Sequence, residues 1–412
     1  MKKILRSALL GTAVGTIGLS ACDATPPQSA VVSRPLASEA IPPSDTLVDV
    51  VRKSLADIIR DDDAYSRARR LGTLLPTLGP ETAPAVQQTL DDPMLDLRGA
   101  EIELLVRFWA TQQPEAAANW AKDKAPMNYH DGAVFSAISA WAQVNPQAAA
   151  GAVWPWTEIP ALERIVPVAL VRGWFAANDP PELRKFISGL PPGIPQQRAI
   201  AAYVAALIQT QGSEALTRWA ESLPDKAPEY KLDVFRRVID VLALVDIEAA
   251  LRWCDTQCWG PYGASMPSLI GRNWVLRDGP AAMEWLSSGS PGYETEQAVR
   301  LTYGLWTRTN REAALAWMAA QTTGEPAPWL RPLYPLYAQV LSGDKPADAI
   351  QWAERTKDPA EREATMIGVA RVWRYLDEPA AAAWLLQSSL SEEAREKVRA
   401  PLPVGERPNP SG

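Results

Sequence analysis

Six arginines stand at fixed distances before a bulky residue that recurs along the chain. Four come two residues before it, and two come six residues before it, one helical turn earlier on the same face. A row of guanidinium groups would suit carboxylates or phosphates, to which each donates parallel hydrogen bonds. The alternative is that they form ion pairs with Glu and Asp of adjacent helices. The six candidates for partner binding are Arg107, Arg172, Arg236, Arg272, Arg300 and Arg371.

Four tryptophans lie outside the recurring pattern, each close to a proline or a glycine. Exposed indoles at such places would stack on sugar rings or on proline-rich peptides. The alternative is that these indoles fill gaps between neighbouring structural units. The four candidate exposed aromatics are Trp154, Trp156, Trp259 and Trp329.

The sequence offers no recognisable catalytic constellation. It contains no nucleotide-binding loop, metal cluster or nucleophile elbow, and its one histidine, His130, sits in a turn-rich stretch where a solvated or capping role is ordinary. Acidic residues before prolines, among them Asp179, Asp278 and Asp358, are interpreted as helix caps. We therefore predict no catalytic residue, no cofactor and no metal site.

Cys254 and Cys258 lie four residues apart, directly after a recurring tryptophan. Other units place a small or apolar residue at the position of Cys254, which favours a buried structural role. An exported protein could hold a disulfide here, but a regular helix directs the two side chains poorly for one. Zinc would need two further ligands, and the only histidine is far away in sequence.

These candidates are positioned by a repeated frame, first seen complete in Trp109, Pro114 and Trp120. It consists of a tryptophan, a proline five residues later and a second tryptophan eleven residues after the first, with other bulky residues replacing one aromatic in places. A spacing of 32 to 35 residues over nine units predicts stacked helical hairpins. A degenerate opening unit has Leu75 at the first position. The first positions are 109, 141, 174, 208, 242, 274, 306, 341 and 373.

Each unit divides into two helices. In the first full unit, residues 97–110 carry an apolar stripe that ends at Trp109, and Pro114 suits the first position of a second helix. The second helices are rich in alanine, which permits close approach to a neighbour. An isolated hairpin of this length is marginally stable, so stability must come from stacking.

The period, the paired helices and the prolines between units resemble the tetratricopeptide class of repeats over about residues 64–398, with HEAT-like packing as an alternative. The Trp–Pro–Trp frame departs from the tetratricopeptide consensus, so no individual residue roles are carried over. The resemblance implies an all-α, right-handed α–α superhelix (solenoid) of about nine to ten hairpin repeats. It also implies that the first helices line a concave side that binds partners.

The N-terminus is a targeting segment. Residues 1–21 have a basic start and a short apolar stretch, and Leu19 to Cys22 resemble the lipobox of bacterial lipoproteins, in which the cysteine is acylated. A plain secretory signal is the alternative. Asp23 resembles an inner-membrane retention signal, although the outer membrane is also open. We expect a flexible tether at 22–43, the repeats with an N-terminal capping helix at 44–398 and a disordered tail at 399–412.

Loss of residues 1–21 takes the net charge from −7 to −10, because Lys2, Lys3 and Arg6 leave with them. So acidic a chain is poorly suited to nucleic acid. The sequence therefore predicts a lipid-anchored, periplasm-facing cell-envelope scaffold that binds a protein or peptide and is not an enzyme. The alternative is a glycan-active enzyme or a glycan-binding protein built as a Trp-rich helical toroid, although no suitably spaced pair of carboxylates stands out.

Overall fold

The computed structural model describes residues 44–178, 180–290 and 292–401. Within these ranges the chain consists of helices joined by turns and contains no β-strand, so the all-α prediction is confirmed. None of the described helices is both long and apolar enough to cross a lipid bilayer. The expected leader at 1–21 and the tether at 22–43 lie outside the described residues.

Most helices come in consecutive pairs that follow the predicted units. The first helices are α2 (Ala64–Leu74), α4 (Gly99–Gln112), α6 (His130–Val144), α8 (Ile165–Ala176), α11 (Pro228–Val245), α13 (Met266–Trp274), α15 (Tyr293–Thr309), α17 (Tyr334–Leu341) and α19 (Pro359–Leu376). The second helices are α3 (Ala83–Leu90), α5 (Pro114–Lys124), α7 (Pro146–Val153), α9 (Pro180–Gly189), α12 (Ile247–Gln257), α14 (Gly279–Ser287), α16 (Arg311–Gln321), α18 (Pro346–Glu354) and α20 (Glu378–Gln387).

The remaining elements complete the row. The continuous stretch α10 (Ile194–Glu221) contains a full pair that bends at Gly212, whose φ of 78° is left-handed. The helices α1 (Ser44–Ile59) and α21 (Glu392–Arg399) lie at the two ends, and α1 packs on the first pair as the predicted capping helix. Short 3₁₀ segments are η1 (Leu75–Thr77), η2 (Pro80–Thr82), η3 (Met127–Tyr129), η4 (Trp154–Glu158) and η5 (Pro328–Leu333).

In seven pairs a connector residue directly precedes the second helix, four positions after the first position of the frame, which we call the anchor of the unit. In Asp377, for example, the backbone N–H donates to Trp373 O at 2.7 Å and closes the first helix, while the carboxylate accepts from Ala380 N and opens the second. The connectors share one conformation, with φ between −132° and −151° and ψ between 70° and 90°. They are Gln113, Asn145, Asp246, Asp278, Asn310, Lys345 and Asp377.

This geometry explains the spacing of the frame. The residue after the connector is the first of the second helix, where a missing N–H costs nothing, so proline fits there. Asp278 accepts from Ala281 N at 3.0 Å and Asp358 accepts from Glu361 N at 2.8 Å, which confirms both as helix caps. Asp179 lies outside the described residues.

The two tryptophans of each complete frame meet inside their own helix pair. Four such pairs have ring centroids 5.6–6.3 Å apart, within the range of favourable aromatic contact. Neighbouring pairs also meet through an anchor, because a Cβ on Gly279 would lie 2.2 Å from the ring of Trp306 in the next unit. The indoles therefore pack both within a pair and between pairs.

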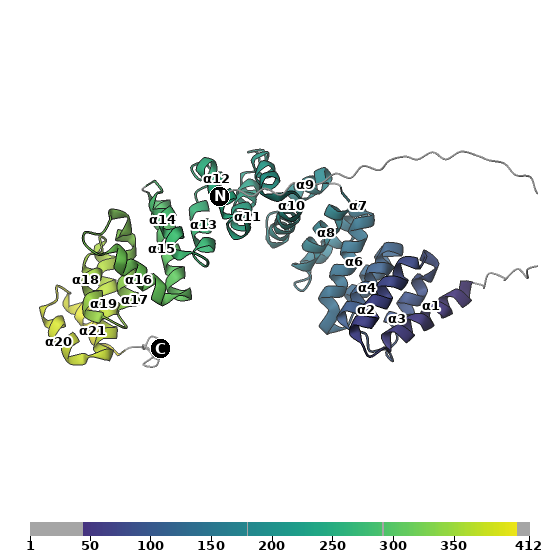
Figure 1. Cartoon of the computed structure of the whole chain (residues 1–412), viewed down its shortest axis with the longest axis horizontal. Helices are drawn as coiled ribbons and strands as arrows, with labels where there is room; N and C mark the ends of the chain where they lie inside the picture. Colours follow the sequence, from purple (N-terminus) through teal and green to yellow (C-terminus); the bar gives the residue numbers. More distant parts are fainter. Residues whose placement is uncertain (1–43, 179, 291, 402–412) are drawn as a thin grey trace, which may run out of the picture.

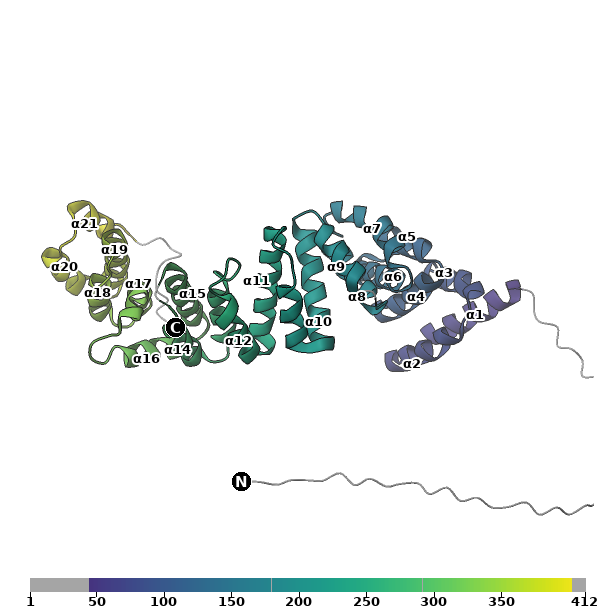
Figure 2. The same cartoon turned by 90° about the horizontal axis from the view of Figure 1, so that it is seen from above.

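The first helices of successive pairs pack on one another, and every extensive contact in the described part of the chain joins elements close in sequence. The result is a long row rather than a globule (Figure 1). It forms an arch in which α12 and α14 follow the outer edge and α11, α13 and α15 lie beneath them. The helices α1 and α20 lie at opposite ends, as the view from above also shows (Figure 2).

One expected boundary and one connector differ from the pattern. The helix α21 continues to Arg399, and Arg371 Nη2 donates to Pro401 O at 3.1 Å, so residues 399–401 belong to the folded body rather than to a tail. The pair that begins with α8 also departs from the common connector, because Asn178 has a left-handed φ of 60°. Asparagine tolerates that conformation better than most residues.

Candidate functional site

Two of the predicted arginines, Arg107 on α4 and Arg172 on α8, line one cleft across α6. We call this the N-terminal arginine cleft; it has a volume of about 610 Å³ and is also lined by Glu103, Phe135 and Gln143. Arg107 Nη2 donates to Gln143 Oε1 at 3.0 Å. Arg172 is exposed and has no polar contact with any described residue. Neither guanidinium is neutralised by an ion pair within the described ranges.

Two more of the predicted arginines, on α11 and α13, line a second cleft of about 490 Å³, together with three arginines that the repeat frame did not identify. We call this the central arginine cleft. It spans α8, α10, α11 and α13, which stand side by side in the middle of the arch (Figure 1). Its charged residues are Arg164, Arg198, Arg236, Arg237 and Arg272, with Asp233 and Asp240.

Asp240 organises one wall of the central arginine cleft. It accepts from Arg237 Nη1 at 3.2 Å, from Arg272 Nη2 at 3.3 Å and from the Asn273 amide at 2.8 Å. Arg236 Nε reaches only Ser265 Oγ, at 3.4 Å. Five guanidinium groups thus face two carboxylates, and the cleft has an excess of positive charge.

Arg164 and Arg198 supply the other wall. Both side chains are exposed, and neither has a polar contact with a described residue. Both lie ten residues before the anchors of their units, Trp174 and Ile208, and Arg331 repeats this offset before Leu341. A search at that offset, in addition to those of two and six residues, would have found them.

The last two predicted arginines belong to other surroundings. Arg300 Nη2 forms an ion pair with Glu361 Oε1 at 2.6 Å, with both side chains about one-third exposed. Arg371 donates to Pro401 O. The structure therefore brings the six arginines together in two groups of two and leaves these two apart.

The four candidate exposed tryptophans are not equivalent. Trp259 is 61% exposed, whereas the other three are half-buried. Trp154 meets the ring of Phe186 edge-on at 5.4 Å, and Lys122 Nζ lies 4.9 Å from the ring centre of Trp156. Trp329 contacts Trp317 at 6.0 Å and also lines a third cleft.

We call this third cleft, of about 800 Å³, the indole cleft. It lies between α15, η5 and the start of α19, and it brings Trp329 together with Arg300. Its other polar side chains carry both signs of charge. From the sequence, Arg300 was predicted to bind a partner and Trp329 to be an exposed aromatic, and nothing indicated that the two are neighbours because they lie in different units.

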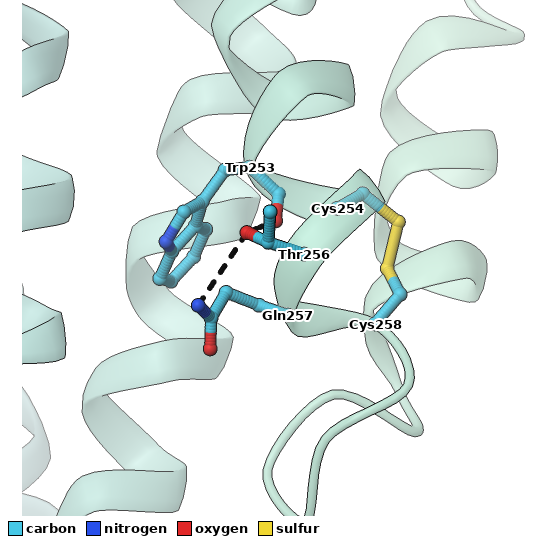
Figure 3. The surroundings of a disulfide bond; sticks show 5 residues. All are labelled: Trp253, Cys254, Thr256, Gln257 and Cys258. Carbon is cyan, nitrogen blue, oxygen red and sulfur yellow. Dashed lines mark hydrogen bonds between the residues drawn. A yellow bond between two sulfur atoms is a disulfide. The ribbon is translucent and has the colours of Figure 1, made fainter.

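Cys254 and Cys258 form a disulfide, with both side chains buried (Figure 3). The sequence favoured a simple buried role because a regular helix separates such residues by about 6 Å along its axis. Here α12 ends at Gln257, and the Cα atoms are 4.7 Å apart, within the range that a disulfide bridges. The following chain folds back on this end, since a Cβ on Gly263 would lie 2.0 Å from Gln257 O.

The titratable groups show few features of acid–base catalysis. His130 Nε2 lies 3.1 Å from Lys122 O and its Nδ1 lies 3.3 Å from Asp131, in a capping arrangement at the start of α6. Hydrogen bonds from Lys231 and Tyr262 lower the pKa of Asp225, and burial raises the pKa of Tyr203. Neither shift gives a group that gains or loses its proton readily near neutrality.

Five carboxyls in the described ranges have a pKa below the usual value, whereas a general acid for glycan hydrolysis requires a raised pKa. The carboxyls concerned are Asp61, Asp225, Asp246, Glu392 and Glu393. In the described ranges no group of three or more His, Cys, Asp or Glu side chains is placed to hold a metal ion. The lipidation candidate Cys22 lies outside these ranges.

No protein-family model, curated protein sequence or solved structure matches this chain.

Proposed function

We propose that this chain is a non-enzymatic scaffold of the bacterial cell envelope. In this proposal a lipid on Cys22 anchors it, with Asp23 favouring the inner membrane, and the folded body faces the periplasm. Its helix pairs form a right-handed superhelix of the tetratricopeptide type, and a protein or peptide binds along the arginine-lined side. The shared connector geometry and the continuous packing of first helices support the repeat architecture.

The central arginine cleft carries the proposal. Five guanidinium groups and only two carboxylates gather there, although the whole chain has a net charge of −7. Like charges held close together repel one another, and an anionic ligand would relieve that repulsion. Arg164 and Arg198, which have no polar partner within the described ranges, are free to form bidentate bonds with carboxylates.

Apolar side chains in the same cleft favour a peptide over a small ion. Ile194 and Leu269 line it beside the arginines, and Ile194 is 44% exposed. An acidic segment that also carries apolar residues would contact both kinds of surface. Four helices side by side have three spacings of about 9 Å between their axes, so the outer two axes are about 27 Å apart. An extended segment of about eight residues covers this distance.

Charge reversal tests this assignment. Arg164→Glu and Arg198→Glu together should weaken capture of the native partner at least about tenfold, because they replace charge-assisted hydrogen bonds with repulsion. The matched control is Arg218→Glu with Arg252→Glu, two exposed arginines of second helices whose ion pairs are with glutamates one turn away. Both double variants should retain the helical circular dichroism of the wild type.

The assay is photo-crosslinking in native membranes, followed by identification of the captured protein and measurement of its affinity. An acidic partner whose binding weakens with salt and with the cleft variant alone would support the proposal. Equal capture by both double variants would remove the cleft from the binding site. Release of sugars from purified peptidoglycan would instead favour the glycan-active enzyme.

The anchor is tested separately. Cys22→Ser should move the protein from the membrane fraction to the soluble periplasmic fraction, because the remaining chain would carry no acyl group. A fully membrane-bound variant would contradict lipidation at this residue without affecting the assignment of the cleft.

A further inference from the structure

We propose that the indole cleft binds an uncharged saccharide, at a site separate from the arginine clefts. The proposal does not depend on the scaffold function, since it concerns different helices and a different ligand chemistry. It rests on the shape of the cleft, its indole wall, its balanced charges and one buried hydroxyl without a partner.

The cleft exists because one first helix is short. The helix α17 has 8 residues, whereas its neighbours α15 and α19 have 17 and 18. The 3₁₀ segment η5 directly precedes α17 in the chain, where a longer first helix would have further helical turns. The ion pair between Arg300 and Glu361 then joins α15 to α19 directly, past the intervening pair.

The wall of the cleft is apolar and partly aromatic. Trp329 is half-buried and accompanied by Pro328, Pro332, Leu286 and Val299. The C–H face of a sugar ring stacks favourably on an indole, which is large, rigid and electron-rich. The volume of about 800 Å³ lies within the usual range for a bound small molecule, so the site accommodates a short oligosaccharide.

The charged side chains around the cleft balance one another. Three cations stand with three carboxylates, so neither an anion nor a cation gains from the site as a whole. A saccharide gains from both, because each hydroxyl accepts from a cation and donates to a carboxylate. This separates the indole cleft from the arginine clefts, whose excess charge selects an anion. The balanced residues are Arg300, Arg331, Lys357, Glu296, Asp358 and Glu361.

Thr356 supplies the most specific observation. The residue is 3% exposed and lines the cleft, yet its Oγ1 has no hydrogen-bond partner among the residues that the structure describes. A buried polar atom left without a partner is uncommon and costs stability. A ligand hydroxyl at this place would satisfy it.

The experiment measures binding of two soluble probes, the trimer of N-acetylglucosamine and maltotriose, by calorimetry and by saturation-transfer NMR. We expect saturable binding of at least one saccharide that does not change with salt concentration. Trp329→Ala should weaken it about tenfold or more through loss of the stacking surface. Thr356→Val preserves the shape and should weaken it by about threefold or more.

The matched control is Trp259→Ala, which removes a 61% exposed indole outside the cleft and should leave saccharide binding unchanged. Thr356→Val also guards against unfolding of Trp329→Ala, since it leaves the contact between Trp329 and Trp317 in place. The proposal is overturned if neither saccharide binds, if a proline-rich peptide binds at this cleft instead, or if Trp259→Ala weakens binding as much as Trp329→Ala. Loss of the arginine-cleft partner would leave this result untouched.

Discussion

Replacing Gly173 with alanine should destabilise the row at the contact between α6 and α8. A Cβ built on Gly173 would lie 2.1 Å from Ser139 O and 2.8 Å from Ala142 Cβ. A backbone oxygen cannot rotate away, so the two helices must separate. Overpacking of this kind costs about 3 kcal/mol at the upper end of its usual range. The higher helix propensity of alanine returns about 1 kcal/mol, which leaves a net loss of about 2 kcal/mol.

Gly368 provides the matched control. It lies inside α19, and no atom would come within 4 Å of a Cβ added there, so Gly368→Ala should stabilise the protein by about 1 kcal/mol. Urea unfolding followed by circular dichroism measures both variants. With a slope of about 2 kcal/mol/M, the midpoint should fall by about 1 M for Gly173→Ala and rise by about 0.5 M for Gly368→Ala. Equal upward shifts for the two variants would refute the close approach of α6 and α8.

Three further predictions concern the connectors and the disulfide. Hydrogen bonds from the Ser213 hydroxyl and the Ala249 N–H lower the pKa of Asp246. The ionised Asp246 therefore adds to the free energy of unfolding above about pH 4, and this stabilisation is lost as the pH falls through the lowered pKa. The urea midpoint should fall less on acidification in Ser213→Ala than in the wild type. Asp278→Ala should cost about 1 kcal/mol through loss of the cap on α14, whereas Asp278→Asn should retain most of it, as thermal unfolding would report. Replacing both Cys254 and Cys258 by alanine should lower the free energy of unfolding by at most about 2 kcal/mol, because the loop that the disulfide closes is short. Amide hydrogen exchange should become faster mainly around the end of α12. Faster exchange along the whole row of helices would contradict this prediction.

The sequence predicted those parts of the fold that repeat. Trp109 and Pro114 located the end of one helix and the start of the next, because a connector of fixed conformation separates the two positions in most units. Likewise, equal offsets from the anchor put Arg107 and Arg172 on the same side of first helices that are both in contact with α6, and these two arginines share a cleft.

Arg164 and Arg198 also repeat, ten residues before the anchors Trp174 and Ile208, and the prediction missed them because it covered only arginines two or six residues before an anchor. The parts that do not repeat could not be found in this way. The disulfide depends on where α12 ends, and a period of 32 to 35 residues does not specify the end of one helix. Side-chain pairing was equally hidden, because the partner of Arg300 is Glu361, beyond the adjacent unit.

The central arginine cleft and the indole cleft both lie where a first helix is short. The helix α13 has 9 residues beside the 18 of α11, and the segment before it contributes Ser265 to the central arginine cleft. The helix α17 is short in the same way beside the indole cleft. Helices of equal length pack along their whole extent and close the space between them, whereas a shortened helix leaves part of its neighbours uncovered.

Proline and glycine cause both interruptions. Residues 259–263 contain Trp259, Gly260, Pro261 and Gly263 just before α13, and residues 326–332 contain three prolines just before α17. Such residues end or prevent a helix at the place where other units continue one. In a row of near-identical pairs, an interrupted first helix therefore leaves room for a ligand beside it, and the interruption can be recognised in the sequence.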